Sequence, residues 1–295
     1  MTVTLPYPLT PQRWNAVYEA VTDDHPAWFF LPPVYDTTQK NGKVTAVTVT
    51  FWVADRVSAQ QELQAVTEEF RALTAHLTDE YEIERVLHDA LARRCEYGED
   101  GAASLTAYGA LVNGKAVCEG YARAMQYLLN AVGIDAVVLY GYDKNGEYHA
   151  WNGVCLDGQW YHLDPTENDN TSVVHHAYFN LTTDQLVATH LWEEEEPVCT
   201  ATQDNFFVRN GGVIANMDLK SVAKETARQL ERGDTAELCW YTEEAFVYGK
   251  NFVDSGAWFV QTVNAYLTDE TKFLTEYRVF YDTLRRTALI CKISE

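Results

Sequence analysis

The sequence predicts an α+β protein in which a helix that carries a cysteine packs on an antiparallel sheet. In "GKAVCEGYARAMQYLLNAVG", residues 114–133, apolar side chains recur at three- and four-residue steps, which is typical of one face of a helix that Gly133 closes. The next segments, "IDAVVLYGY", "EYHAWNGVCL" and "QWYHLD", read as strands joined by an Asn-Gly and an Asp-Gly pair, both strong hairpin signals. Because an apolar helix stripe must be buried, we expect the helix to pack on this sheet.

The first part of the chain, residues 1–58, reads as a small α/β lead-in. A helix is expected over about residues 10–21, followed by a turn at "DDHPAW". Two strands are expected around "WFFLPPVYD" and "KVTAVTVTFWV", linked by Asn41-Gly42. These elements are expected to flank the core on its N-terminal side.

The core is expected over residues 59–200. Two amphipathic helices, at about 59–76 and 79–95, precede the cysteine helix, and the second carries an apolar stripe along one face. His88 lies beside that stripe. We interpret it as a structural histidine that caps or bridges neighbouring groups.

A run of four glutamates at 193–196 predicts a solvated link and a boundary near residue 200, because adjacent carboxylates repel one another and resist burial. The remainder, residues 201–295, reads as an α+β extension whose aromatic residues fill a core. Its expected elements are a strand at 205–210, a helix at 218–232, a strand at 236–242, a long helix at 245–267 and strands at 276–282 and 287–293.

The charge balance excludes several classes of partner. Forty-three Asp and Glu stand against 22 Lys and Arg, a formal net charge of −21, so the field of the protein repels nucleic acid and anionic membrane surfaces. The start of the chain, "MTVTLPYPLTPQRW", lacks a basic segment followed by an apolar one, and no run approaches the ~18 apolar residues of a membrane helix. We therefore expect a soluble, cytoplasmic protein.

Cysteine and histidine spacing argues against disulfides and metals. The six cysteines are scattered, without a C-x-x-C pair, and no two of the eight histidines form an H-x-x-x-H pair. Reduced thiols fit this pattern best. The sequence predicts neither a metal site nor another cofactor.

Cys118 is a candidate nucleophile because it falls in the first turn of the expected helix. There the unpaired backbone N–H groups and the positive end of the helix dipole favour thiolate over thiol. Most free cysteines are instead small core hydrophobes, so this assignment requires a base nearby. None of the other five cysteines has a comparable partner in the sequence.

The hairpin at Asp157-Gly158 supplies such a base. If its turn has two residues, Trp151 faces Asp164, and His149 shares the sheet face of Trp151, one diagonal step from the Asp164 carboxylate. The same arithmetic at Asn145-Gly146 places His149 opposite Tyr142. A cysteine, a histidine and an orienting carboxylate form the arrangement in which imidazolium stabilises thiolate.

The motifs "GKAVCEGYA" and "HAWNGVCLDGQWYHLDPT" resemble the core of the bacterial transglutaminase-like superfamily, and the resemblance covers about residues 60–200. It implies a papain-like fold with Cys118 as nucleophile, His149 as base and Asp164 as its partner. Members of the family include crosslinkers, proteases, deglycosylases and inactive relatives. The resemblance therefore leaves the reaction open.

Our hypothesis is cysteine-dependent acyl transfer on a peptide or carboxamide through a thioester that water resolves. Hydrolysis is favoured because a crosslinker must shelter its thioester from water, and nothing in the sequence identifies a device for this. The alternatives are a protein-crosslinking transglutaminase and a non-catalytic module that binds peptides or proteins in the same cleft.

Three further residues have open roles at this stage. Trp151 is either a core aromatic or a wall that shields the ion pair from water, and it is also a candidate substrate contact. The backbone N–H of Cys118 is expected to stabilise the oxyanion, and either Asn113 or Tyr108 could supply a second donor. The oligomeric state leaves no signal in the sequence.

Overall fold

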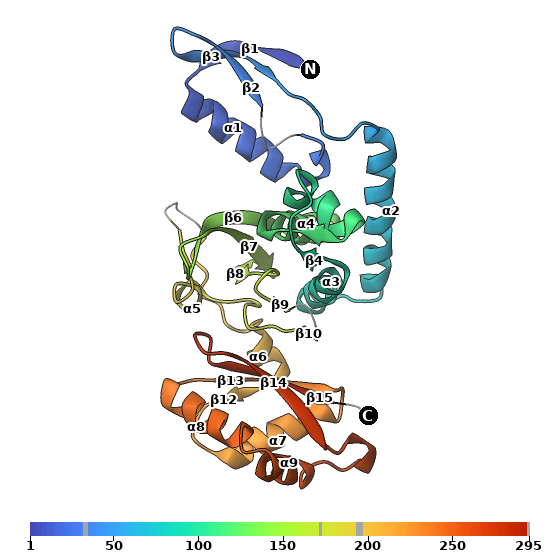
Figure 1. The fold of residues 1–295 in the computed structure, drawn as a ribbon, viewed down its shortest axis with the longest axis vertical. Coiled ribbons are helices and arrows are strands. Elements are labelled where there is room, and N and C mark those ends of the chain that lie inside the picture. The colour runs from blue at the N-terminus through green and yellow to red at the C-terminus, as the bar shows by residue number, and fades with distance from the viewer. Residues whose placement is uncertain (32–34, 171–172, 193–196, 294–295) are drawn as a thin grey trace. The chain divides into compact units, whose positions relative to one another are not determined.

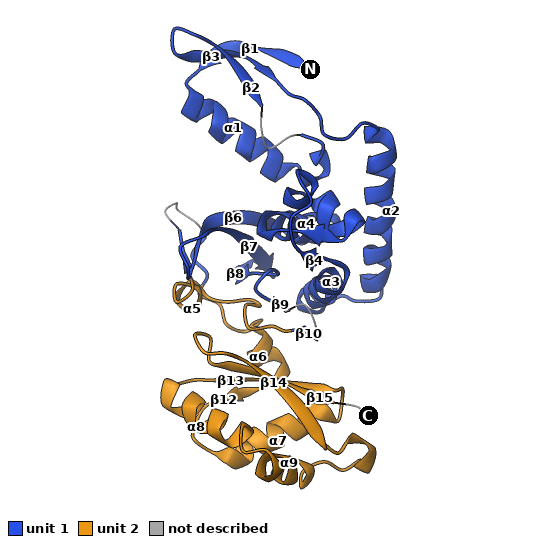
Figure 2. Ribbon diagram, in the orientation of Figure 1, with its two compact units in different colours: residues 1–174, 190–199 blue, residues 175–189, 200–295 orange. Residues whose placement is uncertain are grey.

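The computed structural model (Figure 1) describes residues 1–31, 35–170, 173–192 and 197–293. Contacts divide the chain into two compact units, coloured in Figure 2. Unit 1 comprises residues 1–174 and 190–199, and unit 2 comprises residues 175–189 and 200–295. The three-part division of the sequence at residues 58 and 200 stays a prediction, and the glutamate run at 193–196 lies outside the described residues.

Unit 1 begins with a three-stranded sheet of order β1-β3-β2 and a helix. The elements are β1 (Thr2–Leu9), α1 (Pro11–Asp24), the 3-10 turn η1 (Pro26–Trp28), β2 (Asp36–Lys40) and β3 (Lys43–Thr48). Thr10 caps α1 by accepting a bond from the Arg13 N–H at 3.3 Å. Strand β1 is not among the elements expected from the sequence, although "TVTL" alternates polar and apolar residues.

The strand expected at "WFFLPPVYD", residues 28–36, is wrong for all of its described residues except Asp36. Trp28 ends the turn η1, and only from Asp36 does the segment pair with β3. The prolines at 32–33 lie outside the described residues. The ring of Pro26, at the start of η1, fixes the backbone φ of this residue at a value that suits a turn. The aromatic residues after it therefore begin in a 3-10 turn and not in a strand.

The centre of unit 1 has three long helices and a four-stranded antiparallel sheet of order β11-β6-β7-β8. The helices are α2 (Arg56–Thr74), α3 (Glu80–Arg94) and α4 (Cys118–Ala131), and the strands are β6 (Ala136–Asp143), β7 (Tyr148–Leu156), β8 (Gln159–Leu163) and β11 (His190–Leu191). The connecting elements are β4 (Glu96–Tyr97), η2 (Ala103–Leu105), the π-helical turn η3 (Gly109–Asn113), β5 (Lys115–Ala116), β9 (Asp169–Asn170) and β10 (Val173–Val174).

Helix α4 packs on strands β6 and β7, as Figure 1 shows. Asn152 of β7 fixes this contact, because its side-chain amide donates to the Ala122 carbonyl of α4 at 2.9 Å and to the Val137 carbonyl of β6 at 3.1 Å. Asn152 is fully buried. The predicted architecture, a cysteine-bearing helix on an antiparallel sheet in an α+β fold, is confirmed.

The two hairpins of this sheet differ in turn type. At β7–β8 the residues Asp157 and Gly158 both have positive φ, and Leu156 pairs with Gln159, as expected for a two-residue turn. At β6–β7 the loop has three residues, and only Gly146 has positive φ (+78°). The predicted pairing of His149 with Tyr142 is therefore wrong by one residue.

Gly141 lies opposite His149 instead, and Tyr142 pairs with Tyr148. The physical reason is the Asp143 carboxylate, which accepts bonds from the Asn145 N–H (2.8 Å) and the Glu147 N–H (2.9 Å). This side-chain turn adds one residue and ends in a left-handed glycine, which is the geometry of a bulged three-residue hairpin loop.

Unit 2 contains a second four-stranded sheet, of order β12-β13-β15-β14, on which helices pack. Its elements are α5 (Thr183–Leu186), α6 (Phe206–Asn210), β12 (Val213–Ile214), α7 (Leu219–Leu230), β13 (Thr235–Trp240), α8 (Glu243–Val253), α9 (Ala257–Asn264), η4 (Glu270–Lys272), β14 (Glu276–Asp282) and β15 (Thr287–Ile293). The aromatic residues expected to fill its core were Trp240, Trp258, Phe246 and Phe259. Three of them do so, but the expectation is wrong for Trp258, which is 55% exposed.

Two predicted elements of unit 2 are wrong. The segment at 205–210 is a helix, because Asn205 caps it by accepting from the Phe207 N–H at 3.1 Å and Gly211 ends it with a φ of +80°. The long helix at 245–267 is two helices, broken where Gly256 adopts a φ of +62°. In both segments the apolar pattern predicts the wrong element, whereas the residues at the helix ends indicate the helices that form. Among the described residues, no helix combines the length and apolarity needed to cross a membrane.

Candidate active site

Cys118 is the first residue of α4, directly after the N-cap Val117. The N-cap makes no side-chain bond to the helix, so the first-turn N–H groups are free of a side-chain cap. The thiol is half-buried and packs against a small cluster of Ala122, Val138 and Ala150. A cysteine here combines partial access with the positive end of the helix dipole.

Close backbone packing fixes the first turn of α4. The Val117 N–H donates to the Ser104 carbonyl at 3.0 Å. A Cβ on Gly120 would lie 2.3 Å from that same oxygen, which no side chain tolerates. The sequence "VCEG" therefore lets the turn η2 approach the helix start and holds the Cys118 backbone in place.

His149 on β7 connects the other two predicted site residues. Its Nε2 lies 2.7 Å from Asp164 Oδ2, and both side chains are buried. The Cys118 side chain lies close enough to the imidazole to contribute to the raised pKa of His149. Since Nε2 faces Asp164, Nδ1 is the nitrogen left for the sulfur. The structure thus brings together the three residues that the sequence pattern selected.

Asp164, just after β8, accepts four hydrogen bonds. Oδ2 accepts from His149 and from His190 Nε2 at 3.0 Å, while Oδ1 accepts from the backbone N–H groups of Thr166 (2.9 Å) and Glu167 (3.1 Å). Burial opposes ionisation, but the His149 charge and the bonds from both imidazoles outweigh it and hold the pKa of the Asp164 carboxyl well below its usual range. The carboxylate is therefore a fixed negative charge.

The same pairing acts on His149. Burial by itself lowers the pKa of an imidazole, yet the Asp164 charge, the hydrogen bond to it and the interactions with Cys118 raise the pKa of His149 to about 11. His149 is therefore an imidazolium at neutral pH. A cationic imidazole beside a cysteine side chain is the arrangement that cysteine nucleophiles use.

Trp151 forms a wall behind the imidazole. It is fully buried, stacks on His149 with 6.3 Å between ring centroids and meets the His190 ring edge-on at 5.0 Å. Its indole N–H donates to His162 Nδ1 at 3.3 Å. The substrate contact suggested for Trp151 has no exposed surface to act through, so its packing role is the one the structure supports.

His162 is a neutral member of this wall. Burial and then the neighbouring His190 lower its pKa to about 4, so its Nδ1 is free of a proton and accepts the indole N–H. Its ring also contacts Trp192 at 5.5 Å. The wall excludes water from the far side of the His149–Asp164 pair, which strengthens their interaction.

Sequence reasoning missed two residues of the site. His190 comes from β11, 26 positions after Asp164, and no motif or spacing in the sequence connects them. Asn152 lies within the quoted motif "HAWN", but only the structure shows that it joins the sheet to α4. A pairing pattern predicts neighbours within a hairpin, whereas these contacts depend on tertiary packing.

His149, Asp164 and His190 place potential metal-ligand atoms within 4.8 Å of one another. Both imidazoles bond directly to the same carboxylate oxygen, however, so the three side chains satisfy one another by hydrogen bonds. This geometry is that of a charged hydrogen-bonded group. It fits proton transfer and imidazole orientation better than metal coordination.

The two side chains considered as a second oxyanion donor are engaged with carboxylates. The Tyr108 hydroxyl donates to Glu62, and the Asn113 amide donates to Asp100 Oδ2 at 3.4 Å. The Cys118 N–H at the helix start is the donor that the local backbone presents best.

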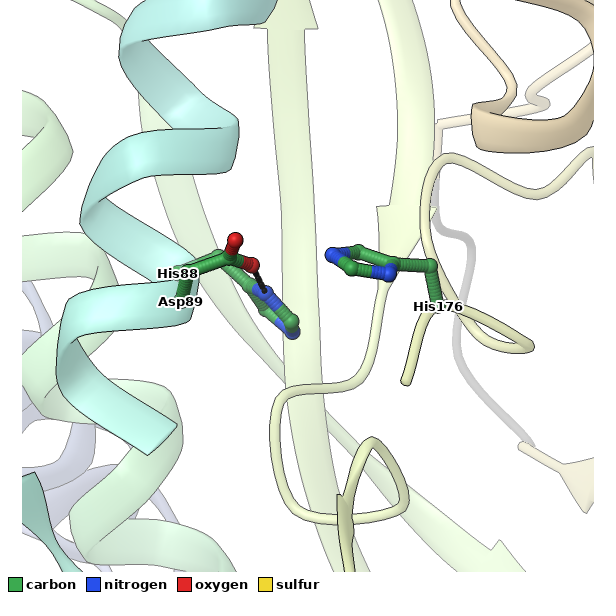
Figure 3. Close-up of side chains that lie close together, drawn as sticks. All are labelled: His88, Asp89 and His176. Atoms are coloured by element: carbon green, nitrogen blue, oxygen red, sulfur yellow. Dashed lines mark hydrogen bonds and ion pairs between the residues drawn. The ribbon is translucent and has the colours of Figure 1, made fainter. Parts of the chain in front are cut away.

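The remaining sequence candidates have structural surroundings. His88 is fully buried, with Nδ1 3.1 Å from Asp89 Oδ1 (Figure 3) and Nε2 3.2 Å from the Asn168 amide, so it bridges as expected. Burial raises the pKa of several other thiols, to about 12 for Cys95. The thiols affected in the same direction are Cys155, Cys239 and Cys291.

Comparison with known proteins agrees with this geometry. Residues 67–165 match the family model of the Transglutaminase-like superfamily. The chain is 35% identical over 63 residues to the Kyphoscoliosis peptidase of Mus musculus, a match that covers 18% of this chain and 10% of that protein. The chain therefore spans only a small part of the length of this relative.

Two solved structures are similar at low scores. A crystal structure of a TGase aligns with a TM-score of 0.35 and 15% identity, covering 59% of this chain and 52% of that one. The periplasmic domain of TgpA from Pseudomonas aeruginosa aligns with a TM-score of 0.29 and 18% identity, covering 46% of this chain and 66% of that one. The family match over residues 67–165, with the cysteine helix and antiparallel sheet described above, identifies this part of the chain as a transglutaminase-like superfamily domain.

Proposed function

We propose that the protein is a cysteine-dependent acyl-transfer enzyme that hydrolyses a peptide or carboxamide through a thioester. The observation that carries the proposal is the position of His149, which bonds to the buried Asp164 carboxylate on one side and interacts with the Cys118 thiol on the other. A nucleophile, a cationic imidazole and a fixed carboxylate are the parts this chemistry needs.

In the proposed reaction the Cys118 thiolate attacks the carbonyl carbon and forms a C–S bond. The carbonyl oxygen becomes an oxyanion that the N–H of Cys118 stabilises at the start of α4. The His149 imidazolium then donates its Nδ1 proton to the leaving nitrogen, the C–N bond breaks and a thioester remains.

Water resolves the thioester in the second half of the reaction. Neutral His149 accepts a proton from the attacking water, a second oxyanion forms, and the C–S bond breaks to regenerate the thiolate and imidazolium. Asp164 keeps its charge throughout and stabilises the imidazolium. Replacement of water by a lysine amine would turn the same steps into crosslinking, which is the alternative outcome.

Chemical labelling tests the nucleophile. Iodoacetamide should modify Cys118 faster than the other cysteines near neutral pH, because it is half-buried beside a cation while burial suppresses ionisation of Cys95, Cys155, Cys239 and Cys291. Peptide mapping by mass spectrometry measures the rate at each site. Preferential labelling of another cysteine would contradict the assignment.

Activity profiling separates the possible reactions. Wild type should release new N-termini or ammonia from peptide and glutamine libraries, and Cys118→Ala should not. Cys155→Ala is the matched control, since this thiol lies on the same sheet without a catalytic partner. Incorporation of a labelled amine would favour crosslinking, and binding without any product would favour a non-catalytic module.

A further inference from the structure

A pocket of about 710 Å³ lies within unit 1 beside the proposed nucleophile. One side is formed by α1 and η1, and the other by α4, β6 and β7. Two lining residues are the sequence neighbours of the site, Glu119 after Cys118 and Tyr148 before His149. A volume of this size fits a small ligand or an amino acid side chain with part of its backbone.

The lining carries more negative than positive charge. Its carboxylates belong to Glu19, Asp23 and Glu119, and its guanidinium belongs to Arg123. Arg123 bonds to Asp23 Oδ1 at 2.6 Å and pairs with Glu119 Oε1 at 2.9 Å. It also donates to the Thr22 carbonyl at 2.8 Å. The guanidinium is thus committed to the wall of the pocket and offers little to an anionic ligand.

Glu19 is the carboxylate that Arg123 does not engage. Its residue is exposed, and no ion pair within the described parts of the chain involves it. The negative charge of these carboxylates also affects Tyr148, on the side of the pocket formed by β7. Burial, and then the charges of Glu119, Glu19 and Asp23, raise the pKa of Tyr148 to about 12.

Aromatic rings supply the rest of the lining. Tyr140 and Tyr148 are nearly parallel at 6.0 Å and 12°, and Tyr148 is 63% exposed. From η1, Trp28 stacks on His25 at 4.2 Å while 43% of its surface is exposed. Exposed aromatic faces next to uncompensated carboxylates attract cations and disfavour anions.

We propose that this pocket, named here the Glu19 pocket after its unpaired carboxylate, binds an alkylammonium or guanidinium group, and that its occupant is a lysine or arginine side chain of the peptide substrate. The inference deepens the proposed function and rests on it for the identity of the occupant. Cys118 and Tyr140 pack against the same small cluster, so a side chain in the pocket belongs to a residue near the reacting carbonyl. A free amine that attacks the thioester shares this chemistry and is the other possible source.

A binding measurement tests the pocket without requiring catalysis. Nα-acetyl-lysine N-methylamide and its norleucine analogue are titrated into Cys118→Ala protein and followed by NMR. The lysine compound should bind roughly tenfold more tightly, the preference expected for a cation held by aromatic faces and a carboxylate. Equal affinities for the two compounds would overturn the proposal.

Charge variants locate the binding. Glu19→Gln removes the unpaired charge, leaves the Arg123 bonds intact and should reduce the lysine preference about threefold to tenfold. Glu276→Gln is the matched control, because it makes the same change of net charge on an exposed residue outside the lining. If both variants lost the same part of the lysine preference, the preference would come from the net charge of the protein. That result would overturn the proposal that the pocket binds the cation.

Turnover identifies the source of the cation. Wild type should process a lysine peptide with a kcat/KM roughly tenfold above that of the Nε-acetyl-lysine peptide, and Glu19→Gln should reduce this ratio. Incorporation of free cadaverine with no preference among the peptides would assign the pocket to the amine and overturn the side-chain occupant. Selective lysine binding to Cys118→Ala without turnover of any peptide would overturn the acyl-transfer function and support cation binding by the pocket.

Discussion

Asp164 organises the site at the scale of single residues. Its two oxygens accept bonds from His149 and His190 and from two backbone N–H groups, so the carboxylate that orients the base also closes its own turn. One side chain therefore both forms a turn and bonds to the imidazole of His149. We expect His190 to position the proposed base through its bond to Asp164.

His190→Phe tests this role, because it keeps an aromatic ring beside Trp151 and removes the N–H that bonds to Asp164. We expect kcat to fall roughly tenfold with little change in KM, since a bond to a charged group contributes about 1.5–3 kcal/mol. Asp164 loses a donor and keeps its charge, so it should attract the His149 proton more strongly, and the alkaline limb of the kcat/KM profile should move to higher pH.

Two comparisons make the result specific. His190→Gln keeps a donor and should restore part of the activity, whereas Asp164→Asn should lose about four orders of magnitude in kcat because the amide favours the wrong tautomer of His149. If His190→Phe had the wild-type kcat/KM profile and only a lower melting temperature, His190 would have a structural role and no role in positioning the base.

The sequence predicted Cys118, His149 and Asp164 because each depends on a local rule. A helix start fixes the first residue, and a two-residue Asp-Gly turn fixes the register between the other two. The same rule placed Tyr142 wrongly, because Asp143 builds a longer loop at the neighbouring hairpin. No local rule predicts the role of His190, because its contact with Asp164 depends on how β11 pairs with β6.

At the scale of elements, α4 and β7 must keep a fixed relation for the thiol and imidazole to meet. Helix α4 is anchored near both ends. Asn152 donates to the Ala122 carbonyl four residues from Cys118, and Asn130 accepts from the Ala136 N–H near the helix end. The first anchor lies beside the site, and the second lies about 18 Å along the helix from Cys118.

Removing each anchor in turn should show that both anchors contribute to the free energy of unfolding and that only the one beside the site affects kcat. Asn152→Ala and Asn130→Ala should each lower the free energy of unfolding by about 1–3 kcal/mol, because each removes side-chain hydrogen bonds to the backbone of α4 or β6. Only Asn152→Ala should also lower kcat, roughly tenfold to hundredfold, since a small displacement at the helix start misplaces the nucleophile. Urea unfolding and steady-state kinetics measure both effects. Equal losses of kcat in the two variants would contradict this division.

Element prediction succeeded where caps and periodicity agreed and failed where they conflicted. Asp55 and Asp79 cap α2 and α3, and both helices lie close to their expected ranges. At 205–210 the aromatic run suggested a strand although Asn205 and Gly211 are helix-end residues. In such short segments two capping residues determine the structure more than the apolar pattern does.

At the scale of the whole molecule, the charge of −21 sets a background for every pH effect. Acidification protonates carboxylates and relieves their mutual repulsion, which favours the folded state. The buried His149–Asp164 pair acts in the opposite direction at low pH. The effect of net charge is common to wild type and to a variant of the pair, so it cancels in the difference between their free energies of unfolding. Salt at about 0.5 M also screens the exposed charges more than the buried pair.

The pH dependence of this difference follows from the directions of the two pKa shifts. Asp164 has a lowered pKa in the folded state, so its contribution is present above its ordinary pKa near 3.8 and is lost as the pH falls through the folded value. His149 has a raised pKa, so its contribution is complete below about 6.5 and declines as the pH rises towards about 11. The pair should therefore stabilise the protein most between about pH 4 and 6.5.

Urea unfolding of wild type and His149→Gln at pH 5, 7 and 9 in high salt measures this contribution. We expect the difference in the free energy of unfolding to be largest at pH 5, smaller at pH 7 and smallest at pH 9, because above pH 6.5 folding must take up a proton that the unfolded chain does not hold. Glu276→Gln, on the exposed surface, should differ from wild type by a small and nearly constant amount. A His149→Gln difference that is constant from pH 5 to 9 would mean that the pKa of His149 is the same in the folded and unfolded protein, and a difference that grows from pH 5 to 7 would mean that His149 is neutral in the folded protein. Either result would contradict the imidazolium proposed beside Cys118.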